Sequence, residues 1–531
     1  MPLTQKVSIL FFLFLFMLGF SVVKDYGVGW DEEAQIEIGK KSYDYIVNGD
    51  QSLLTYCDRD YGVGFELPVY AVQQFFTTKV SQYYFRHFCV HGMFLLGLLF
   101  LFKAQLIFYA KFSGKYWISL LTILMIVLSP RIYAESFYNS KDIVLLAVSC
   151  INFYTLLHAV DKPSKTAWLI HGLSSAYLLD IRIIGLVNVM LTIGFLFLFI
   201  LIHRSSRKQH VVYLLIYLFT TSTVLYFIWP YLHQHPLEKI KEIFNSMAAF
   251  RWRFDVLFMG SIINSTKLPS YYTLVWIGLT TPILFLLGSI QGVLCSVRNF
   301  FRLKSFKEIA ETKQVYLSSI VGLAFGPIVA TIIFNSVMYD AWRQLFYVYP
   351  YLIMLSVFGF YRLYVFFSSY KILKVFLYGF MSVQCIAVIV CMIQAHPNEN
   401  VYFNEIWPRK NQSLLRDFER DYWGLSYKQA LLKACSMLKT EKDTIHILCA
   451  HTPGKLNSVF IPANLQDRVK VYLQKEIPDS MKQQMDYFIT TYRETPNLLP
   501  MCKEKIWSLH IQQNEVVALF DLSKDRQCYE K

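Results

Sequence analysis

Long apolar runs recur along the first 394 residues and alternate with short polar connectors. The first run, VSILFFLFLFMLGFSVV at residues 7–23, is about long enough to span a bilayer, because a helix rises about 1.5 Å per residue across about 30 Å of hydrocarbon. No small-residue cleavage motif separates it from Lys24, so we interpret it as an uncleaved first helix. Further candidate spans lie at residues 88–110, 116–130, 142–160, 166–180, 183–202, 211–229, 271–297, 314–335, 345–366 and 370–394. The pattern predicts a polytopic α-helical membrane protein with about eleven transmembrane helices.

Basic residues gather in the connectors on one side of this arrangement. These connectors carry fifteen basic residues against three acidic ones, Asp161, Glu308 and Glu311. The basic residues are Lys6, Lys111, Lys115, Lys162, Lys165, Arg204, Arg207, Lys208, Arg298, Arg302, Lys304, Lys307, Lys313, Lys371 and Lys374. Because Lys and Arg are enriched in cytoplasmic loops, we expect this side and the N-terminus to be cytoplasmic and the C-terminus to lie outside.

The composition agrees with the bilayer as the main solvent. Of the 531 residues, 55% are hydrophobic and 17% are charged, which is too apolar for a soluble domain of this length. The net charge of +14 is largely accounted for by the cytoplasmic connectors. We therefore expect membrane lipids, and no nucleic acid, among the partners of this chain.

The residues expected on the outer side form loops and a tail. The loops cover residues 24–87, 131–141, 230–270 and 336–343. After residue 396 the sequence turns polar, and short runs such as DTIHILCA, RVKVYL, MDYFITTY and NEVVALFDL indicate strands beside a helical pattern in SYKQALLKACSMLK. We predict two domains: a membrane domain at residues 1–396 and a small α/β domain at residues 397–531.

Three adjacent carboxylates, Asp31, Glu32 and Glu33, open the first outer loop. The apolar residues after them recur at spacings that predict an amphipathic helix lying along the membrane surface. Carboxylates in such a place are often solvated loop residues, and the surrounding sequence has to decide between that interpretation and a functional one.

The run DEEAQIEIGKKSYDYIVNGD at residues 31–50 resembles the first-loop signature of the GT-C superfamily of lipid-linked sugar transferases. This superfamily includes protein O-mannosyltransferases and bacterial aminoarabinose transferases. Its members show an Asp-Glu pair, an A-x-x-E-I-like helix and a Gly-Asp, which here are Asp31 and Glu32, Ala34 with Glu37 and Ile38, and Gly49 with Asp50. In that family the Asp of the pair is the catalytic base, so the resemblance implies this role for Asp31.

A second stretch, SPRIYAESFYNSKDIVLLAVS at residues 129–149, resembles the second acidic loop of the family. Asp142 occupies the Asp position of that loop, although an acid at a helix N-terminus is also favoured by the helix dipole alone. Polar residues in the same stretch form a cluster at the membrane surface, which is costly unless the cluster is solvated or used. Its members Arg131, Glu135, Asn139 and Lys141 are predicted to bind substrate.

Later stretches extend the resemblance. LPSYYTLVWIGLTTP at 268–282 is similar to an L-P-W-Y-Y segment of the family and points to Tyr271. MYDAWRQLFYVYP at 338–350 is similar to a Y-D-G-x-R-H-F stretch and retains Asp340 and Arg343, which would equally suit a local i,i+3 ion pair. The runs HPNENVYFNEI and DYWGLSYKQAL resemble segments of a bacterial branch.

The resemblance implies an inverting glycosyltransferase that moves a sugar from a polyprenyl-phosphate or dolichyl-phosphate carrier to a glycan, lipid or protein acceptor. The departing lipid phosphate needs charge neutralisation, whereas the acceptor needs a base. Asp31 would take the acceptor proton, and Arg343 with Arg131 would meet the phosphate. Glu32 and Asp142 would orient Asp31 or the acceptor, or hold a divalent ion such as Mg²⁺ or Mn²⁺, and the sequence does not assign a metal.

Other functions stay open at this point. A transporter or flippase of a lipid-linked substrate would also place charges at a membrane, but the spans show no paired broken helices in two matching halves. An accessory protein whose tail recruits partners is a third possibility. His87 with His91, and the HQH run at 233–235, are weaker candidates for metal binding. The wording of the motifs favours a bacterial inner membrane, with the endoplasmic reticulum membrane as the alternative.

Overall fold

The computed structural model describes residues 2–248, 253–303, 308–309, 311–438, 444–478, 481, 484–493 and 505–522. Within these ranges nine helices are long and apolar enough to cross a membrane, or ten if the bent pair α5 and α6 is one span. The nine contain α1 (Leu3–Val22), α4 (Lys79–Phe108), α7 (Asp142–Asp161), α9 (Leu186–Ile202), α10 (Arg207–Ile228), α13 (Ile283–Phe300), α14 (Thr312–Ile333), α15 (Tyr349–Phe366) and α16 (Lys371–Ala395). The chain is therefore a polytopic helical membrane protein, as predicted.

Two of the eleven predicted spans are not among the nine, those at residues 116–130 and 166–180. α5 (Lys115–Val127) ends just before Pro130, which begins α6 (Pro130–Tyr138) after a bend of 73°. α8 (Lys165–Ile181) has 17 residues and is about 26 Å long, less than the hydrocarbon thickness of about 30 Å. The predicted span 271–297 is split at Pro282 into α12 (Tyr272–Thr280) and α13, because proline lacks the amide hydrogen that a continuous helix needs.

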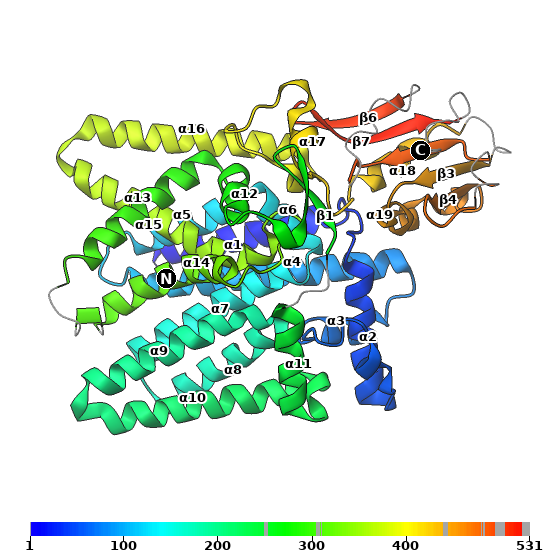
Figure 1. The fold of residues 1–531 in the computed structure, drawn as a ribbon. Coiled ribbons are helices and arrows are strands. Elements are labelled where there is room, and N and C mark those ends of the chain that lie inside the picture. The colour runs from blue at the N-terminus through cyan, green and yellow to red at the C-terminus, as the bar shows by residue number, and fades with distance from the viewer. Residues whose placement is uncertain are drawn as a thin grey trace.

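The membrane helices run along one common direction, and the remaining elements gather at one end of them (Figure 1). At this end α2 (Glu32–Asn48) and α11 (Pro236–Ala248) run across that direction, as expected for helices along a membrane surface (Figure 1). The helix predicted after Asp31 is α2, and α3 (Glu66–Gln73) packs against it. The connections between α9 and α10 and between α15 and α16, where predicted cytoplasmic charges cluster, lie at the opposite end (Figure 1).

A short hairpin and a small sheet complete this end of the molecule. The hairpin pairs β1 (Asp255–Phe258) with β2 (Ser261–Asn264). The sheet has the order β4-β3-β5-β7-β6, with β3 parallel to β4 and β5, and β7 antiparallel to β5 and β6. Its strands are β3 (Ile445–Cys449), β4 (Val469–Leu473), β5 (Tyr487–Thr490), β6 (Lys505–Ile511) and β7 (Asn514–Asp521). α18 (Tyr427–Cys435) packs against β5 and β7, and α19 (Thr452–Leu456) follows β3, which gives the small α/β region that the sequence predicts.

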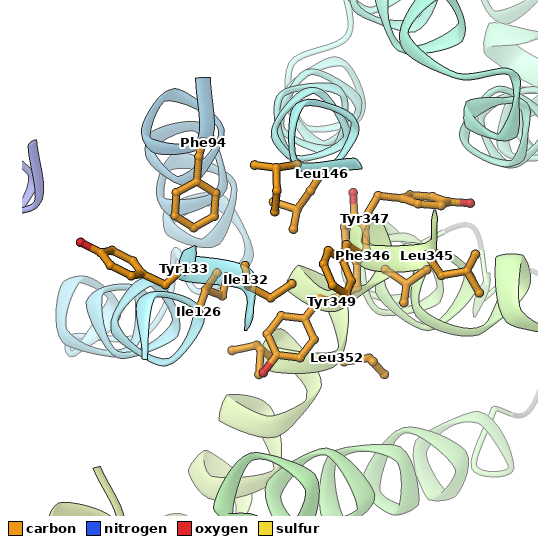
Figure 2. Close-up of a cluster of buried hydrophobic side chains, with 14 of the residues drawn as sticks. Phe94, Ile126, Ile132, Tyr133, Leu146, Leu345, Phe346, Tyr347, Tyr349 and Leu352 are labelled. Atoms are coloured by element: carbon orange, nitrogen blue, oxygen red, sulfur yellow. The ribbon is translucent and has the colours of Figure 1, made fainter. Parts of the chain in front are cut away.

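The largest hydrophobic core fixes the elements that carry the candidate site. Figure 2 shows Ile132 of α6, Leu146 of α7 and Phe346 of the short 3-10 helix η7 (Arg343–Val348) in one buried cluster. Phe418 and Trp423 from the segment before the sheet belong to the same core. Residues 403–425 therefore pack on the membrane helices, and the separate core of the sheet begins with α18.

Candidate active site

Asp31, the residue immediately before α2, contacts Arg343 at the start of η7. Arg343 Nη1 donates to Asp31 Oδ2 at 2.8 Å. The Asp31 side chain is 29% exposed, whereas Arg343 is 5% exposed. Burial raises the pKa of Asp31, but the charges of Arg343, Lys141 and Arg493 outweigh this effect and lower the pKa below its usual value. Asp31 is thus an ionised carboxylate that solvent can reach.

Asp142, the first residue of α7, holds the same arginine from the buried side. Its side chain is 2% exposed and is paired with Arg182 through Oδ1. Asp142 Oδ2 accepts a hydrogen bond from Asn139 Nδ2 at 3.1 Å and lies 3.7 Å from Arg343 Nη1. The Arg343 guanidinium therefore lies between the carboxylates of Asp31 and Asp142.

Asp340 is the third aspartate that contacts Arg343. Its Oδ2 accepts from Arg343 Nη2 at 3.0 Å, and its Oδ1 accepts from Arg493 Nη2 at 2.8 Å. Asp340 and Ala341 have φ angles of 51° and 63°, which residues other than glycine rarely adopt. The glycine that the family motif carries at position 341 fits this backbone. The i,i+3 ion pair that the sequence left as an alternative is formed, and it is one part of a larger charge network.

The remaining polar residues of the second outer stretch flank Asp142. The fully buried Glu135 accepts from the hydroxyl of Tyr422 at 2.7 Å and from Asn139 Nδ2 at 2.8 Å. Lys141 is half-buried, and its Nζ lies 3.8 Å from the centre of the Tyr61 ring. Glu135, Asn139 and Lys141 thus surround the head of α7, where the sequence predicts substrate-binding residues.

Glu32 faces a different partner from Asp31. Its Oε1 accepts from the backbone nitrogen of Gly29 at 2.7 Å, and its Oε2 lies 3.0 Å from His87 Nε2. The Glu32 side chain is 3% exposed. Glu32 therefore ties the start of α2 to α4 and to the chain before it, and this contact positions its neighbour Asp31.

Arg131 and Tyr271 lie outside the charge network. Arg131 Nε donates to the carbonyl of Tyr402 at 2.9 Å, and its guanidinium lies 4.9 Å from the centre of the Phe403 ring. Tyr271 is 52% exposed, and its ring lies 6.2 Å from that of Phe258. Arg131 is buried among aromatic rings, and its role as a ligand of the donor phosphate stays a prediction.

A cavity of about 210 Å³ opens beside Arg182. Its polar lining includes Arg182 and Gln344. Much of the remaining lining is apolar and comes from the start of the Ile183–Ile202 span, from the segment between α14 and η7, and from η7 itself: Ile183, Ile184, Val337, Met338 and Leu345. A cation at the edge of an apolar cavity suits a ligand with an anionic head and an apolar chain.

In this structure the space between the three aspartates is filled by Arg343, and the possible divalent ion stays a prediction. Mg²⁺ needs several oxygen ligands turned toward one point, whereas here Arg343 occupies the space between Asp31, Asp142 and Asp340. Among the described residues no group of three acidic, His or Cys side chains converges. His87 faces Glu32, while His91 Nδ1 lies 2.9 Å from Ser136 Oγ, so these two histidines do not share a ligand position.

Two arginines of the network are absent from the sequence prediction. Arg182 ends α8 in the run LLDIRIIG, and a charged residue inside an apolar stretch is a signal that could have found it. Arg493 lies after β5 in a polar segment, where nothing in the pattern distinguishes it from the other cations of the tail.

Comparisons with known proteins find similarity at the level of structure and not of sequence. No protein-family model and no curated protein match the chain. Among solved structures, it is similar to the crystal structure of ArnT from Cupriavidus metallidurans bound to undecaprenyl phosphate, at 10% identity over 98% of each chain and a TM-score of 0.45.

Proposed function

We propose that this protein is an inverting glycosyltransferase that moves a sugar from a polyprenyl-phosphate or dolichyl-phosphate carrier to an acceptor on the outer side of the membrane. The observation that carries the proposal is the state of Asp31, which is ionised, open to solvent and oriented by a buried arginine. Asp142 and Asp340 are 2% and 6% exposed and are engaged by arginines, so Asp31 is the member of the three that an acceptor can reach. The five stretches that resemble GT-C enzymes support the same chemistry.

The cavity beside Arg182 is a suitable place for the donor. Its apolar lining would take the first isoprenoid units, and Arg182 would neutralise the phosphate. Arg343 has both terminal nitrogens on aspartates, so it orients Asp31 and adds positive charge instead of acting as the main phosphate ligand. This division of roles between Arg182 and Arg343 differs from the role that the family resemblance implies for Arg343.

The reaction is a single displacement at the anomeric carbon. The acceptor oxygen or nitrogen forms a bond to that carbon while the bond from the carbon to the phosphate oxygen breaks. Asp31 takes the acceptor proton, and the lipid phosphate leaves with the bonding electrons as an anion that Arg182 stabilises. Attack from the side opposite the phosphate inverts the configuration of the sugar. Asp142, Asp340 and Glu32 act by holding Arg343 and the start of α2 in place.

The proposed setting is a bacterial inner membrane with the site on the periplasmic face. The positive connectors at the opposite end of the helices support this orientation. Nucleotide sugars are confined to the cytoplasm, so a site on the outer face needs a sugar that a lipid has already carried across.

An assay in detergent tests the proposal and separates it from transport. Purified protein is mixed with a radiolabelled polyprenyl-phosphate sugar and envelope extracts as acceptors, and the products are separated by mass. We expect label to move onto an acceptor, because catalysis does not need two membrane sides. A lipid transporter would bind the donor and leave the label on the lipid, which would refute the proposal.

A further inference from the structure

Side chains from the C-terminal half of the chain form hydrogen bonds with the segment between α1 and α2, which leads directly into Asp31. Lys428 of α18 donates from Nζ to the carbonyl oxygens of residues 24–26 at 2.6–3.2 Å. Asn457 pairs with the backbone of Val28 twice: its Nδ2 donates to the carbonyl at 2.8 Å, and its Oδ1 accepts from the amide at 2.9 Å. Two side chains beyond residue 425 thus replace the backbone partners that this extended segment would otherwise lack.

These contacts explain why residue 27 is a glycine, which has no side chain. A Cβ atom on Gly27 would lie 2.5 Å from Asn457 Oδ1 and 2.8 Å from the carbonyl oxygen of Leu425. Three residues later, the amide of Trp30 donates to the carbonyl of Trp423 at 3.1 Å. The run GVGW before Asp31 is therefore shaped to lie against the C-terminal half of the chain.

Arg493, after β5, connects the same region to the charges around Arg343. Its Nη2 lies 2.8 Å from Asp340 Oδ1, and its Nη1 donates to the carbonyl of Tyr422 at 2.5 Å. Its guanidinium also lies 4.6 Å from the centre of a Trp30 ring. One side chain thus contacts both the residue next to Asp31 and the aspartate that holds Arg343.

We infer that the C-terminal α/β region completes the active site, with Arg493 and Asn457 as positioning residues for Asp31 and Arg343. This inference rests on the proposed function, since it assigns these two residues to the same reaction. Asp31 faces three cations from three parts of the chain: Arg343 of η7, Lys141 before α7, and Arg493. Removing the Arg493 charge leaves Asp340 with Arg343 as its remaining arginine partner and makes the surroundings of Asp31 less positive.

The test compares full-length variants with the wild-type protein in the detergent assay over a range of pH. For Arg493→Gln we expect kcat/KM to fall by about 10- to 100-fold and its acidic limb to move to higher pH, because Asp31 loses a stabilising charge. Arg493→Lys keeps the charge but loses the fork of hydrogen bonds, so its acidic limb should stay at the wild-type position while kcat falls. Asn457→Asp should lower kcat and leave donor KM nearly unchanged.

Arg420→Gln is the matched control. Arg420 is a buried arginine that donates to the carbonyls of Ile511 and Asn514, so its loss loosens packing without removing a charge that faces Asp31. We expect a lower melting temperature and an unmoved acidic limb. Thermal unfolding and donor binding are measured for every variant.

Three results would overturn the inference. They are an acidic limb that stays in place in folded Arg493→Gln, an equal shift in Arg420→Gln, and wild-type kinetics in Arg493→Lys if the glutamine variant does not fold. Failure of the proposed function looks different: the wild-type protein would transfer no sugar, or Asp31→Asn would transfer it at the wild-type rate.

Discussion

Two polar regions of this molecule differ in how their polar groups are paired: one uses neutral groups and the other uses charges. Between the spans, Asn152 of α7 donates to Ser175, and His171 of α8 has a hydroxyl partner on each ring nitrogen, Thr155 at 2.8 Å and Thr192 at 3.0 Å. In the network that we call the outer network, at the end of the helices near α2, full charges are brought together around Arg343. The inner network joins helices through amides and hydroxyls, whereas the outer network concentrates charge beside solvent.

The difference supports the charged region as the proposed site. Groups such as His171 are fully buried and hydrogen-bonded, so they contribute to helix packing. Buried ion pairs add little net stability and require every charge to keep its partner. A cluster of three aspartates and several arginines is therefore a costly way to join helices. Its solvent-accessible carboxylate, Asp31, is the group to which we assign a chemical role.

The largest effect is expected at the centre of the outer network. Arg343→Gln removes the cation shared by Asp31, Asp142 and Asp340, and should lower the free energy of unfolding by about 3–5 kcal/mol, since buried carboxylates lose a partner. Any activity that remains should have its acidic limb at higher pH, because the pKa of Asp31 rises when the nearest positive charge is lost. Urea unfolding in detergent measures the first effect, and Arg343→Lys is the control that keeps the charge.

A smaller loss is expected at Arg182. Arg182→Gln leaves Asp142 with Asn139 and the more distant Arg343, so we expect a loss of about 2–3 kcal/mol. Because Arg182 also lines the proposed donor cavity, the Kd for a polyprenyl phosphate should rise in this variant. Unchanged donor binding in a folded Arg182→Gln protein would contradict the proposed donor site.

The inner network should respond through stability alone. His171→Leu removes hydrogen bonds to Thr155 and Thr192 and should cost about 1–2 kcal/mol. Transfer activity per folded molecule should stay at the wild-type value. A large loss of activity in this variant would show that the two regions are coupled and would weaken the comparison.

The smallest effect is a pH dependence at His396, just after α16. Burial lowers its pKa, but the adjacent carboxylates of Glu399 and Asp25 outweigh burial and raise the pKa from 6.5 to about 9. A histidine with a raised pKa stabilises the folded state fully below pH 6.5, and this contribution is lost as pH rises through 9. After screening by solvent, we expect a change on the order of 1 kcal/mol or less. Melting temperatures of the wild type and His396→Gln should therefore converge above pH 9.

The sequence predicted much of this architecture because membrane helices and the α2 amphipathic pattern follow local rules. The nine helices differ from the eleven predicted spans at Pro130, where an apolar run bends, and at α8, which has 17 residues; hydropathy averaged over a run registers neither feature. Asp31, Asp142, Asp340 and Arg343 were all chosen from motifs, and the structure brings them to one place.

The remaining partners depend on contacts that no local pattern contains. Arg493 reaches Asp340 across 153 positions of sequence, and Asn457 reaches Val28 across 429. Glu32 was predicted to orient Asp31 or the acceptor, or to hold a divalent ion, and no local pattern indicated its partner His87, 55 residues away. Tertiary packing therefore determines which member of each predicted set is open to solvent.

Single-turnover transfer by Asp31→Asn, with Glu33→Gln as the matched control, tests the central claim most directly. Glu33 is an exposed carboxylate two positions along the same chain segment, where it contacts Tyr83 and Lys79. We expect the asparagine variant to bind the labelled polyprenyl-phosphate sugar like the wild type and to transfer it at least about 1,000-fold more slowly, while the glutamine variant stays within about threefold of the wild type. Transfer by Asp31→Asn at a rate similar to the wild type would contradict the assignment of Asp31 as the base.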